Sequence, residues 1–306
     1  MRLNLVSAEV VDGLAVIQFV AEPRDTFAYG TSIRALAQGQ IRVTELNEAG
    51  SVNALNIQNL SDQFVLFLDG DVLVGAKQDR VLNTPLLLAP RSTTTVPVSC
   101  VERGRWHFTT PIFQPAPTAA PPSLRALKAE SLAADTPQAS AFLADQGRVW
   151  AHVAQLKAAM HASAPTDSLA QCFDEKRAHI DQLVHRLQPA RDANGLAVWA
   201  GRQFLVADVF NRADALTDYF PALTRAVGLD LAAAPTTPAP AQPEALLQVL
   251  GTQIESALAS SSPPRPGVGV GTLRHLQTPD LAGFVLDYEL QRIHLSLAAR
   301  PLRQRY

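Results

Sequence analysis

Charged residues gather at the ends of two β-prone segments between positions 75 and 106. They are Lys77, Asp79 and Arg80 in the first segment, and Glu102 and Arg105 in the second. Lysine and arginine side chains bind phosphate and carboxylate groups, while aspartate and glutamate can donate or accept protons. If the two ends meet, they would form a polar site that holds a phosphorylated compound beside an acid or a base.

Strand periodicity supports such a meeting. If residues 95–102 are extended, Cys100 and Glu102 share one face with two valines. If residues 73–80 are extended, Lys77 and Asp79 share a face, opposite Gln78 and Arg80. Each strand then carries a charged group at one end of an apolar row. The alternative is a set of surface ion pairs, which contribute little to stability.

Three further residues near this region have a functional and a structural interpretation. Cys100 is a candidate nucleophile if a nearby cation lowers the pKa of its thiol, and otherwise it is a buried core residue. Trp106 can stack on a base or a sugar ring, or it can simply pack against the protein. Asp208 interrupts an apolar strand pattern, as a strand-end surface residue or as a second acid of the site.

Other motifs point away from metal and nucleotide-loop chemistry. The seven histidines show no HExxH spacing, so we expect no metal site. The stretch "GVGVGT" at 267–272 lacks both the GxGxxG and the GxxxxGK[ST] patterns, and we expect a loop there. The sequence identifies no cofactor and sets no oligomeric state.

The elements that must position the site indicate an α+β fold. Residues 1–110 alternate apolar and polar residues between turn signals, which predicts a mostly antiparallel, β-sandwich-like region. Its first hairpin turns at Asp12-Gly13. The proline-rich stretch 111–123 is expected to be a loop or linker. The β-rich region 1–110 would carry the candidate site.

Helices are expected to dominate residues 124–190 and to pack on the β-rich region. Apolar spacing predicts helices over 145–162 and 167–188, the second capped by Asp167 or Ser168. Residues 195–306 are expected to form a small sheet with helices, in which the last hairpin pairs with the hairpin at 196–210. These three segments form separate domains or one continuous domain.

Composition narrows the class of protein. The chain has 306 residues and a net charge of −2, without a run of lysine and arginine, which excludes a nucleic-acid-binding surface of the usual kind. The N-terminus lacks the continuous apolar region of a signal peptide, and no stretch has the length of a membrane span. Two cysteines are too few for a disulfide framework. We therefore expect a cytoplasmic protein without a membrane or nucleic-acid partner.

Four segments carry a resemblance to a known family. They are "LDGDVLVGAKQDRVLNT" at 68–84, "PVSCVERGRW" at 97–106, "DQGRVW" at 145–150 and "FLVADVFNRADAL" at 204–216. Together they resemble the ARG and Rhodanese-Phosphatase-superfamily-associated protein domain, where ARG stands for ADP-ribosylglycohydrolase. The likeness covers nearly the whole chain. Asp79 stands where the family also uses Asn, and Asp71 stands where Glu is usual.

The resemblance implies a role in the metabolism of ADP-ribosyl or NAD-derived compounds, since the family is named for its company with ADP-ribose-processing enzymes. It carries no established activity. By analogy, the implied site consists of Lys77, Gln78, Asp79, Arg80, Asn83, Cys100, Glu102, Arg105 and Trp106.

Three functional hypotheses follow. In the first, a hydrolase-type protein processes a phosphorylated sugar or nucleotide. Lys77, Gln78, Arg80, Asn83, Arg105 and Trp106 would bind this small-molecule ligand, and Glu102, Asp79 and Cys100 would act in catalysis. In the second, the same basic and aromatic groups bind a ligand without turnover. In the third, the charges hold a sheet edge in a structural or partner-interacting domain, and "DQGRVW" docks there.

Overall fold

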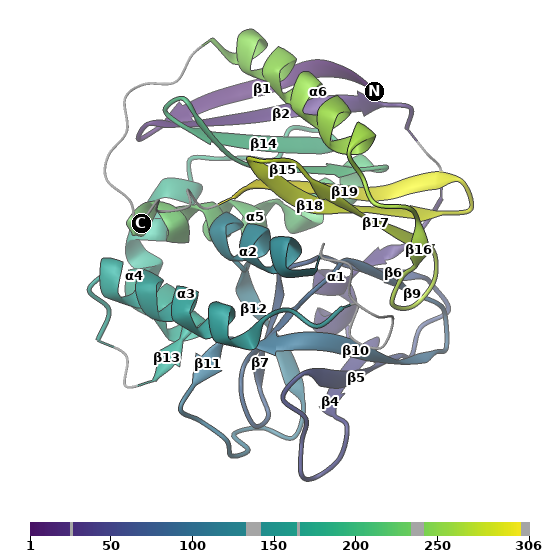
Figure 1. Cartoon of the computed structure of the whole chain (residues 1–306), viewed down its shortest axis with the longest axis vertical. Helices are drawn as coiled ribbons and strands as arrows, with labels where there is room; N and C mark the ends of the chain where they lie inside the picture. The colour runs from purple at the N-terminus through teal and green to yellow at the C-terminus, as the bar shows by residue number, and fades with distance from the viewer. Residues whose placement is uncertain (25–26, 133–141, 164–165, 234–241, 301–306) are drawn as a thin grey trace.

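The computed structural model describes residues 1–24, 27–132, 142–163, 166–233 and 242–300. Alternating apolar and polar residues form antiparallel strands, and the largest sheet collects strands from both ends of the chain (Figure 1). In spatial order its strands are β1 (Arg2–Val11), β2 (Leu14–Glu22), β14 (Gly195–Ala200), β15 (Gln203–Phe210), β19 (Gln291–Ala299), β18 (Leu281–Tyr288), β17 (Thr272–Gln277) and β16 (Arg265–Pro266).

Two predictions about this sheet are confirmed. The first hairpin turns through Asp12 and Gly13, both with positive φ, as a two-residue turn between paired strands requires. The last hairpin pairs with the 196–210 hairpin, with Asp208 of β15 opposite Ser296 of β19. The sheet is larger than the small C-terminal sheet we expected, because the N-terminal hairpin joins it through β2 and β14.

A second, six-stranded sheet carries the candidate site. In spatial order its strands are β12 (Phe113–Ala119), β7 (Asp71–Gly75), β8 (Arg80–Leu82), β10 (Thr93–Cys100), β5 (Ala54–Asn59) and β4 (Ile41–Glu45). Smaller sheets contain β3 (Gly30–Thr31), β6 (Val65–Phe67) and β9 (Leu86–Leu88), and β11 (Glu102–Arg103) with β13 (Asp167–Ser168). The strands of the first 110 residues are thus shared among all four sheets.

The prediction of a loop over 111–123 is wrong. Residues 113–119 form β12, which pairs with β7 despite Pro115 and Pro117. Proline lacks a backbone N–H, so a strand that contains it is tolerated at the edge of a sheet, where one side of the strand needs no partner. β12 is such an edge strand, and its pairing register shifts between Pro115 and Ala119.

The helices within the described residues pack between and around the sheets. They are α1 (Ser32–Ala37), α2 (Pro122–Leu132), α3 (Gln146–Ala159), α4 (Leu169–Val184), α5 (Ala213–Ala232) and α6 (Pro243–Ala259). Ser168 caps α4, since its side chain accepts a hydrogen bond from the backbone N–H of Gln171, as one of the two predicted caps would. α3 lies against β10, and α6 lies across β1 and β2.

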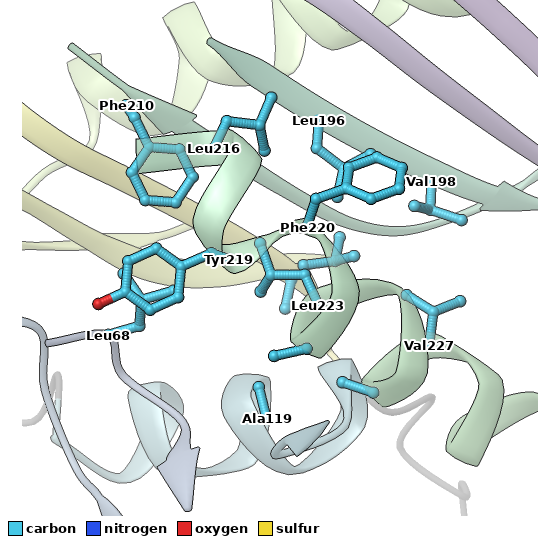
Figure 2. Packing of buried hydrophobic residues seen from close by; sticks show 14 of the residues in the cluster. Leu68, Ala119, Leu196, Val198, Phe210, Leu216, Tyr219, Phe220, Leu223 and Val227 are labelled. Carbon is cyan, nitrogen blue, oxygen red and sulfur yellow. The ribbon is translucent and has the colours of Figure 1, made fainter. Parts of the chain in front are cut away.

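The main core forms around α5. Its Tyr219, Phe220 and Leu223 pack against Leu196 of β14 and Phe210 of β15 (Figure 2). Leu68 and Ala119, from the region of the six-stranded sheet, join the same cluster. The two large sheets therefore share one apolar core, which confirms the mixed α+β class. Among the described helices, none has both the length and the apolar character that crossing a membrane requires.

Candidate functional site

The first half of the site is a turn rather than a strand end. β7 stops at Gly75 and β8 starts at Arg80, so the expectation of one extended strand over 73–80 is wrong. Gly75 has φ +113° and Ala76 has φ +41°, which reverses the chain between the two strands. A side chain at position 75 would lie about 2.3 Å from the hydroxyl of Thr110, so this turn requires glycine.

The second half follows β10. Its last residue, Cys100, pairs with Arg80, the first residue of β8. β11 then carries Glu102, and the chain bends away at Gly104, whose φ is +108°. The pairing of β8 with β10 therefore brings the turn 76–79 beside residues 102–105, although more than twenty positions separate them in sequence.

Asp79, Glu102 and Arg105 meet where these halves join, and we call them the Arg105 cluster. Nη2 of Arg105 lies 2.6 Å from Oε2 of Glu102 and 3.1 Å from Oδ1 of Asp79. Nε of Arg105 donates to both carboxylate oxygens of Glu102, each at 2.9 Å. The backbone N–H of Asp79 also donates to Oε2 of Glu102, at 3.2 Å. One guanidinium thus holds both carboxylates in place.

Arg105 also binds the backbone around it. Nη1 donates to the carbonyl oxygens of Ala76 at 2.7 Å and His107 at 3.1 Å, and Nη2 donates to that of Gly75 at 3.3 Å. Every nitrogen of the guanidinium therefore already has a partner. Arg105 fixes the turn 76–79 against the loop 103–110, and it has no free donor for a phosphate in this conformation.

Asp79 is the titratable member of the cluster. Burial raises the pKa of its carboxyl, and the nearby Glu102 raises it further, while the hydrogen bond from the N–H of Gly75 and the charge of Arg105 lower it. The resulting pKa is about 6. The carboxyl can therefore hold or release a proton close to neutral pH, which suits an acid or base.

Lys77, Trp106 and Phe108 lie at the surface of the site, and we call them the aromatic rim. Nζ of Lys77 lies 5.0 Å from the ring centre of Phe108 and 5.7 Å from that of Trp106, both cation–π distances. It also donates to the carbonyl oxygen of Ala49 at 2.9 Å. Trp106 is 44% exposed and Phe108 is 49% exposed, so part of each side chain remains accessible.

A buried arginine, Arg80, lies beneath the aromatic rim and is paired with Glu45. The guanidinium of Arg80 lies 5.5 Å from the Trp106 ring centre and is fully buried. It donates to the carbonyl oxygens of Gln78, at 2.6 Å, and Ser51, at 3.3 Å, and it lies 3.7 Å from a carboxylate oxygen of Glu45. Burial lowers the pKa of Arg80. Arg80 therefore supports the rim from below and offers no surface to a ligand.

A comparison with models of protein families shows which family this chain belongs to. Residues 2–298 match the model of the ARG and Rhodanese-Phosphatase-superfamily-associated Protein domain. The chain belongs to this family. No curated protein and no solved structure matches the chain.

Three of the residues that the family resemblance implied lie away from the rim. Cys100 is fully buried and its thiol donates to the carbonyl oxygen of Val52 at 3.2 Å. Burial raises the pKa of this thiol to about 11, which does not fit a thiolate nucleophile. Asn83 binds Ser99 and Phe142, and the side-chain amide of Gln78 donates to the carbonyl oxygen of Glu102. All three side chains make hydrogen bonds within the protein and so stabilise the fold around the site.

The family segment at 145–150 docks on the same strands. The side chain of Gln146, at the start of α3, accepts from the N–H of Cys100 at 2.8 Å and donates to its carbonyl oxygen at 2.9 Å. Beside it, the guanidinium of Arg103 lies 5.7 Å from the Trp150 ring centre. α3 therefore completes the backbone hydrogen bonding at the end of β10, as the third hypothesis expects.

Glu45 and Phe108 are site residues that the sequence interpretation missed. β4 buries positions 41, 43 and 45, so Glu45 occupies the apolar face of its strand. A carboxylate at a position where alternation predicts an apolar residue is the signal that could have identified it. One of its oxygens, Oε2, is buried without a hydrogen-bond partner in the described part of the chain.

Asp208 is neither a strand-end surface residue nor a second acid of the site, the two alternatives that the sequence left open. It is fully buried and lies 2.7 Å from the Arg125 guanidinium and 3.0 Å from Nε2 of His294. This network lies where α2 meets the eight-stranded sheet, apart from the Arg105 cluster. Among the described residues, no three His, Cys, Asp or Glu side chains are grouped closely enough to hold a metal ion.

Proposed function

We propose that the protein binds a phosphorylated sugar or nucleotide at the aromatic rim and processes it, in metabolism linked to ADP-ribose or NAD. The observation that carries this proposal is the position of the Lys77 ammonium between the exposed rings of Trp106 and Phe108. An ammonium neutralises phosphate, and an exposed aromatic face stacks on a base or sugar. Family membership adds the link to ADP-ribose only by association.

The reaction class that fits best is hydrolysis assisted by an acid. Asp79, with a pKa of about 6, retains a proton in part of the population near neutral pH and can pass it to a leaving oxygen. Glu102 is held beside it by the same Arg105. Two carboxyl groups in different environments are the usual arrangement for dividing acid and base roles.

A ligand-binding or structural role without turnover is the second candidate. The observation that favours it is the complete use of the Arg105 guanidinium by Asp79, Glu102 and backbone carbonyls. In this alternative the cluster only holds the turn and the loop in the shape that presents the rim. The docking of Gln146 on Cys100 fits the same structural role.

A thermal-shift and calorimetric screen tests the ligand. The panel contains ADP-ribose, NAD, sugar phosphates and nucleotides. We expect at least one compound to raise the Tm of the wild-type protein, as binding to the folded state requires. Lys77→Ala and Trp106→Ala should abolish the shift. Arg177→Ala is the matched control, because it removes an exposed cation over the ring of Phe173 elsewhere on the surface.

The outcomes separate the alternatives. No shift with any compound would contradict a phosphorylated ligand, and a shift that survives both rim substitutions would contradict the location. For a ligand that binds, Asp79→Asn should retain binding and lose turnover. Turnover that persists in Asp79→Asn would exclude the acid role, and binding without turnover in the wild type would establish the second candidate.

A further inference from the structure

A cavity of about 900 Å³ lies at one end of the eight-stranded sheet, away from the aromatic rim. Residues from β15, β17, β18 and β19 line it, together with Leu258 near the end of α6. In Figure 1 the turn between β18 and β19 projects on the side toward which α6 ends. The volume lies within the range of about 300–1,000 Å³ that is typical of small-molecule sites.

Two arginines and two carboxylates are among the residues that line the cavity. Arg274 of β17 lies 2.9 Å from one oxygen of Asp287, and Arg292 of β19 lies 3.5 Å from the other. Glu289 lies exposed at the tip of the adjoining turn. Burial lowers the pKa of the partly buried Arg292, Asp287 raises it, and the like charge of Arg274 lowers it further. An anion in the cavity would relieve this repulsion.

One buried donor on the cavity wall lacks an acceptor, and a second has only a long contact. Asn211 is 5% exposed, and its carbonyl oxygen accepts a hydrogen bond from the hydroxyl of Tyr29 at 2.7 Å. Its Nδ2 has no hydrogen-bond partner within the described residues, and the Nε of Arg292 has only the 3.5 Å contact with Asp287. A buried donor without a well-placed acceptor is unfavourable, because it has lost its hydrogen bonds to water. Both donors would be satisfied by a ligand that brings acceptor oxygens.

Apolar side chains also line the cavity, and one of them lies on a strained turn. Leu258 and the buried Val209 and Phe210 form part of the wall. At the turn between β18 and β19, Glu289 and Leu290 have φ of +48° and +66°. Leucine rarely adopts this conformation, and Leu290 is fully exposed. Leu290 therefore lines the cavity, although it does not pack in the protein core.

We propose that this cavity binds an amphipathic organic anion. Its carboxylate or phosphate head would accept hydrogen bonds from Arg274, Arg292 and Asn211. Its apolar body would lie against Leu258 and under Leu290. The inference does not depend on the function proposed for the rim, because it uses none of the rim's residues.

Fluorescence titration with anilinonaphthalene sulfonate tests the site, since this probe combines an anionic head with aromatic rings. We expect saturable binding to the folded protein, competed by dodecanoate and dodecyl phosphate but not by inorganic phosphate. Arg292→Gln should weaken probe binding about tenfold, the loss of roughly one charge-assisted hydrogen bond. Arg202→Gln, an exposed arginine in the turn between β14 and β15, is the matched control and should bind like the wild type.

Leu290→Asn distinguishes a ligand contact from a structural effect. Asparagine tolerates positive φ better than leucine, so the variant should unfold at the same or a higher temperature. It should nevertheless bind the probe about three- to tenfold more weakly, because an apolar contact is lost. Unchanged affinity in both Leu290→Asn and Arg292→Gln would overturn the proposal, as would loss of probe binding in Lys77→Ala or Trp106→Ala.

Discussion

Two places in the molecule hold one arginine between two carboxylates, and they differ in what that arrangement does. Arg105 lies between Asp79 and Glu102 at the edge of the six-stranded sheet. Arg125 lies between Asp69 and Asp208, where α2 meets the eight-stranded sheet. Each place sets one guanidinium against two carboxylates, but Asp208 also lies 3.0 Å from His294, so the differences come from the partners, the geometry and burial.

In the Arg125 network every nitrogen of the guanidinium donates to a carboxylate. Arg125 makes two hydrogen bonds to Asp208, at 2.7 and 2.8 Å, and two to Asp69, at 3.1 and 3.2 Å. Gly70 leaves room for this approach, because a side chain there would lie about 3.1 Å from the Arg125 side chain. Burial alone would raise the pKa of Asp208, yet Arg125 and His294 together hold it well below its usual range.

The Arg105 cluster shares its bonds unequally. Glu102 receives three contacts from the guanidinium, whereas Asp79 receives one, at 3.1 Å. The pKa of Asp79 is therefore raised to about 6, since burial outweighs the single ion pair. Asp208, with two bonds from one guanidinium, has a lowered pKa, whereas Asp79, with one guanidinium contact and one backbone N–H, keeps a proton to higher pH.

Arg125→Met should produce the largest loss of stability. It leaves the buried Asp69 and Asp208 without their guanidinium partner and removes the link that Arg125 makes between them. Removing one partner of a buried ion pair costs about 3–5 kcal/mol. Urea denaturation of the variant measures this cost, with Arg177→Met as an exposed control expected to differ from the wild type by less than about 0.5 kcal/mol. A loss below about 1 kcal/mol for Arg125→Met would contradict the comparison.

Asp208→Asn and Asp79→Asn should respond to pH with opposite signs. The lowered pKa of Asp208 means that its contribution is present above the unfolded pKa, of about 3.9, and is lost on acidification. The raised pKa of Asp79 means that its contribution to stability is fully present below the unfolded pKa and is lost as the pH rises through about 6. Near neutral pH, Asp208→Asn should therefore cost about 3 kcal/mol.

Urea denaturation between pH 3.5 and 7.5 measures both effects as the difference in the free energy of unfolding from the wild type. For Asp208→Asn the loss should shrink on acidification below about pH 4. For Asp79→Asn the difference should move in favour of the variant by about 2–3 kcal/mol between pH 4 and 7. Parallel pH profiles for the two variants would show that the two carboxylates share one environment after all.

Much of the fold is predictable because the signals are local. Asp12-Gly13 determines the first turn, Ser168 caps α4, and Pro243 opens α6, each within a few residues of the structure it controls. The strand β12 and the turn 76–79 could not be predicted in the same way. Pro115 argues against a strand until its edge position is known, and the reversal at Gly75 depends on how closely Thr110 approaches.

The site is predictable in part for a related reason. Sequence spacing predicts that Asp79, Glu102 and Arg105 meet, because each lies at the end of a strand-like segment. It does not predict that Arg80 is buried while Trp106 is exposed, since that depends on the loop that brings Glu45 and Gly50 beside them. The pairing of Arg125 with Asp208 joins residues 83 positions apart and leaves no local pattern.

Arg105→Met should lower the free energy of unfolding by less than Arg125→Met does. Its effect should be confined to the structure around the Arg105 cluster. We expect a loss of about 1–3 kcal/mol, because Asp79 and Glu102 each keep a backbone N–H donor, from Gly75 and from Asp79, when the guanidinium is removed. The N–H groups of the turn 76–79 and the loop 103–110 should exchange faster with solvent, while those of β15 and β19 keep their protection. Hydrogen exchange measured by mass spectrometry resolves these segments, and a uniform loss of protection would contradict a local role.

Trp106→Ala should have the smallest effect on the fold. The ring is 44% exposed, and its contacts are cation–π distances to Lys77 and Arg80 rather than core packing. The free energy of unfolding should change by less than about 0.5–1 kcal/mol, as measured in urea. Phe204→Ala is the contrasting control, because this buried ring packs on Trp199 and its loss should cost about 3–5 kcal/mol. A loss in Trp106→Ala equal to that of the control would show that the rim supports the fold, which would leave the exposed rings without a reason to be ligand contacts.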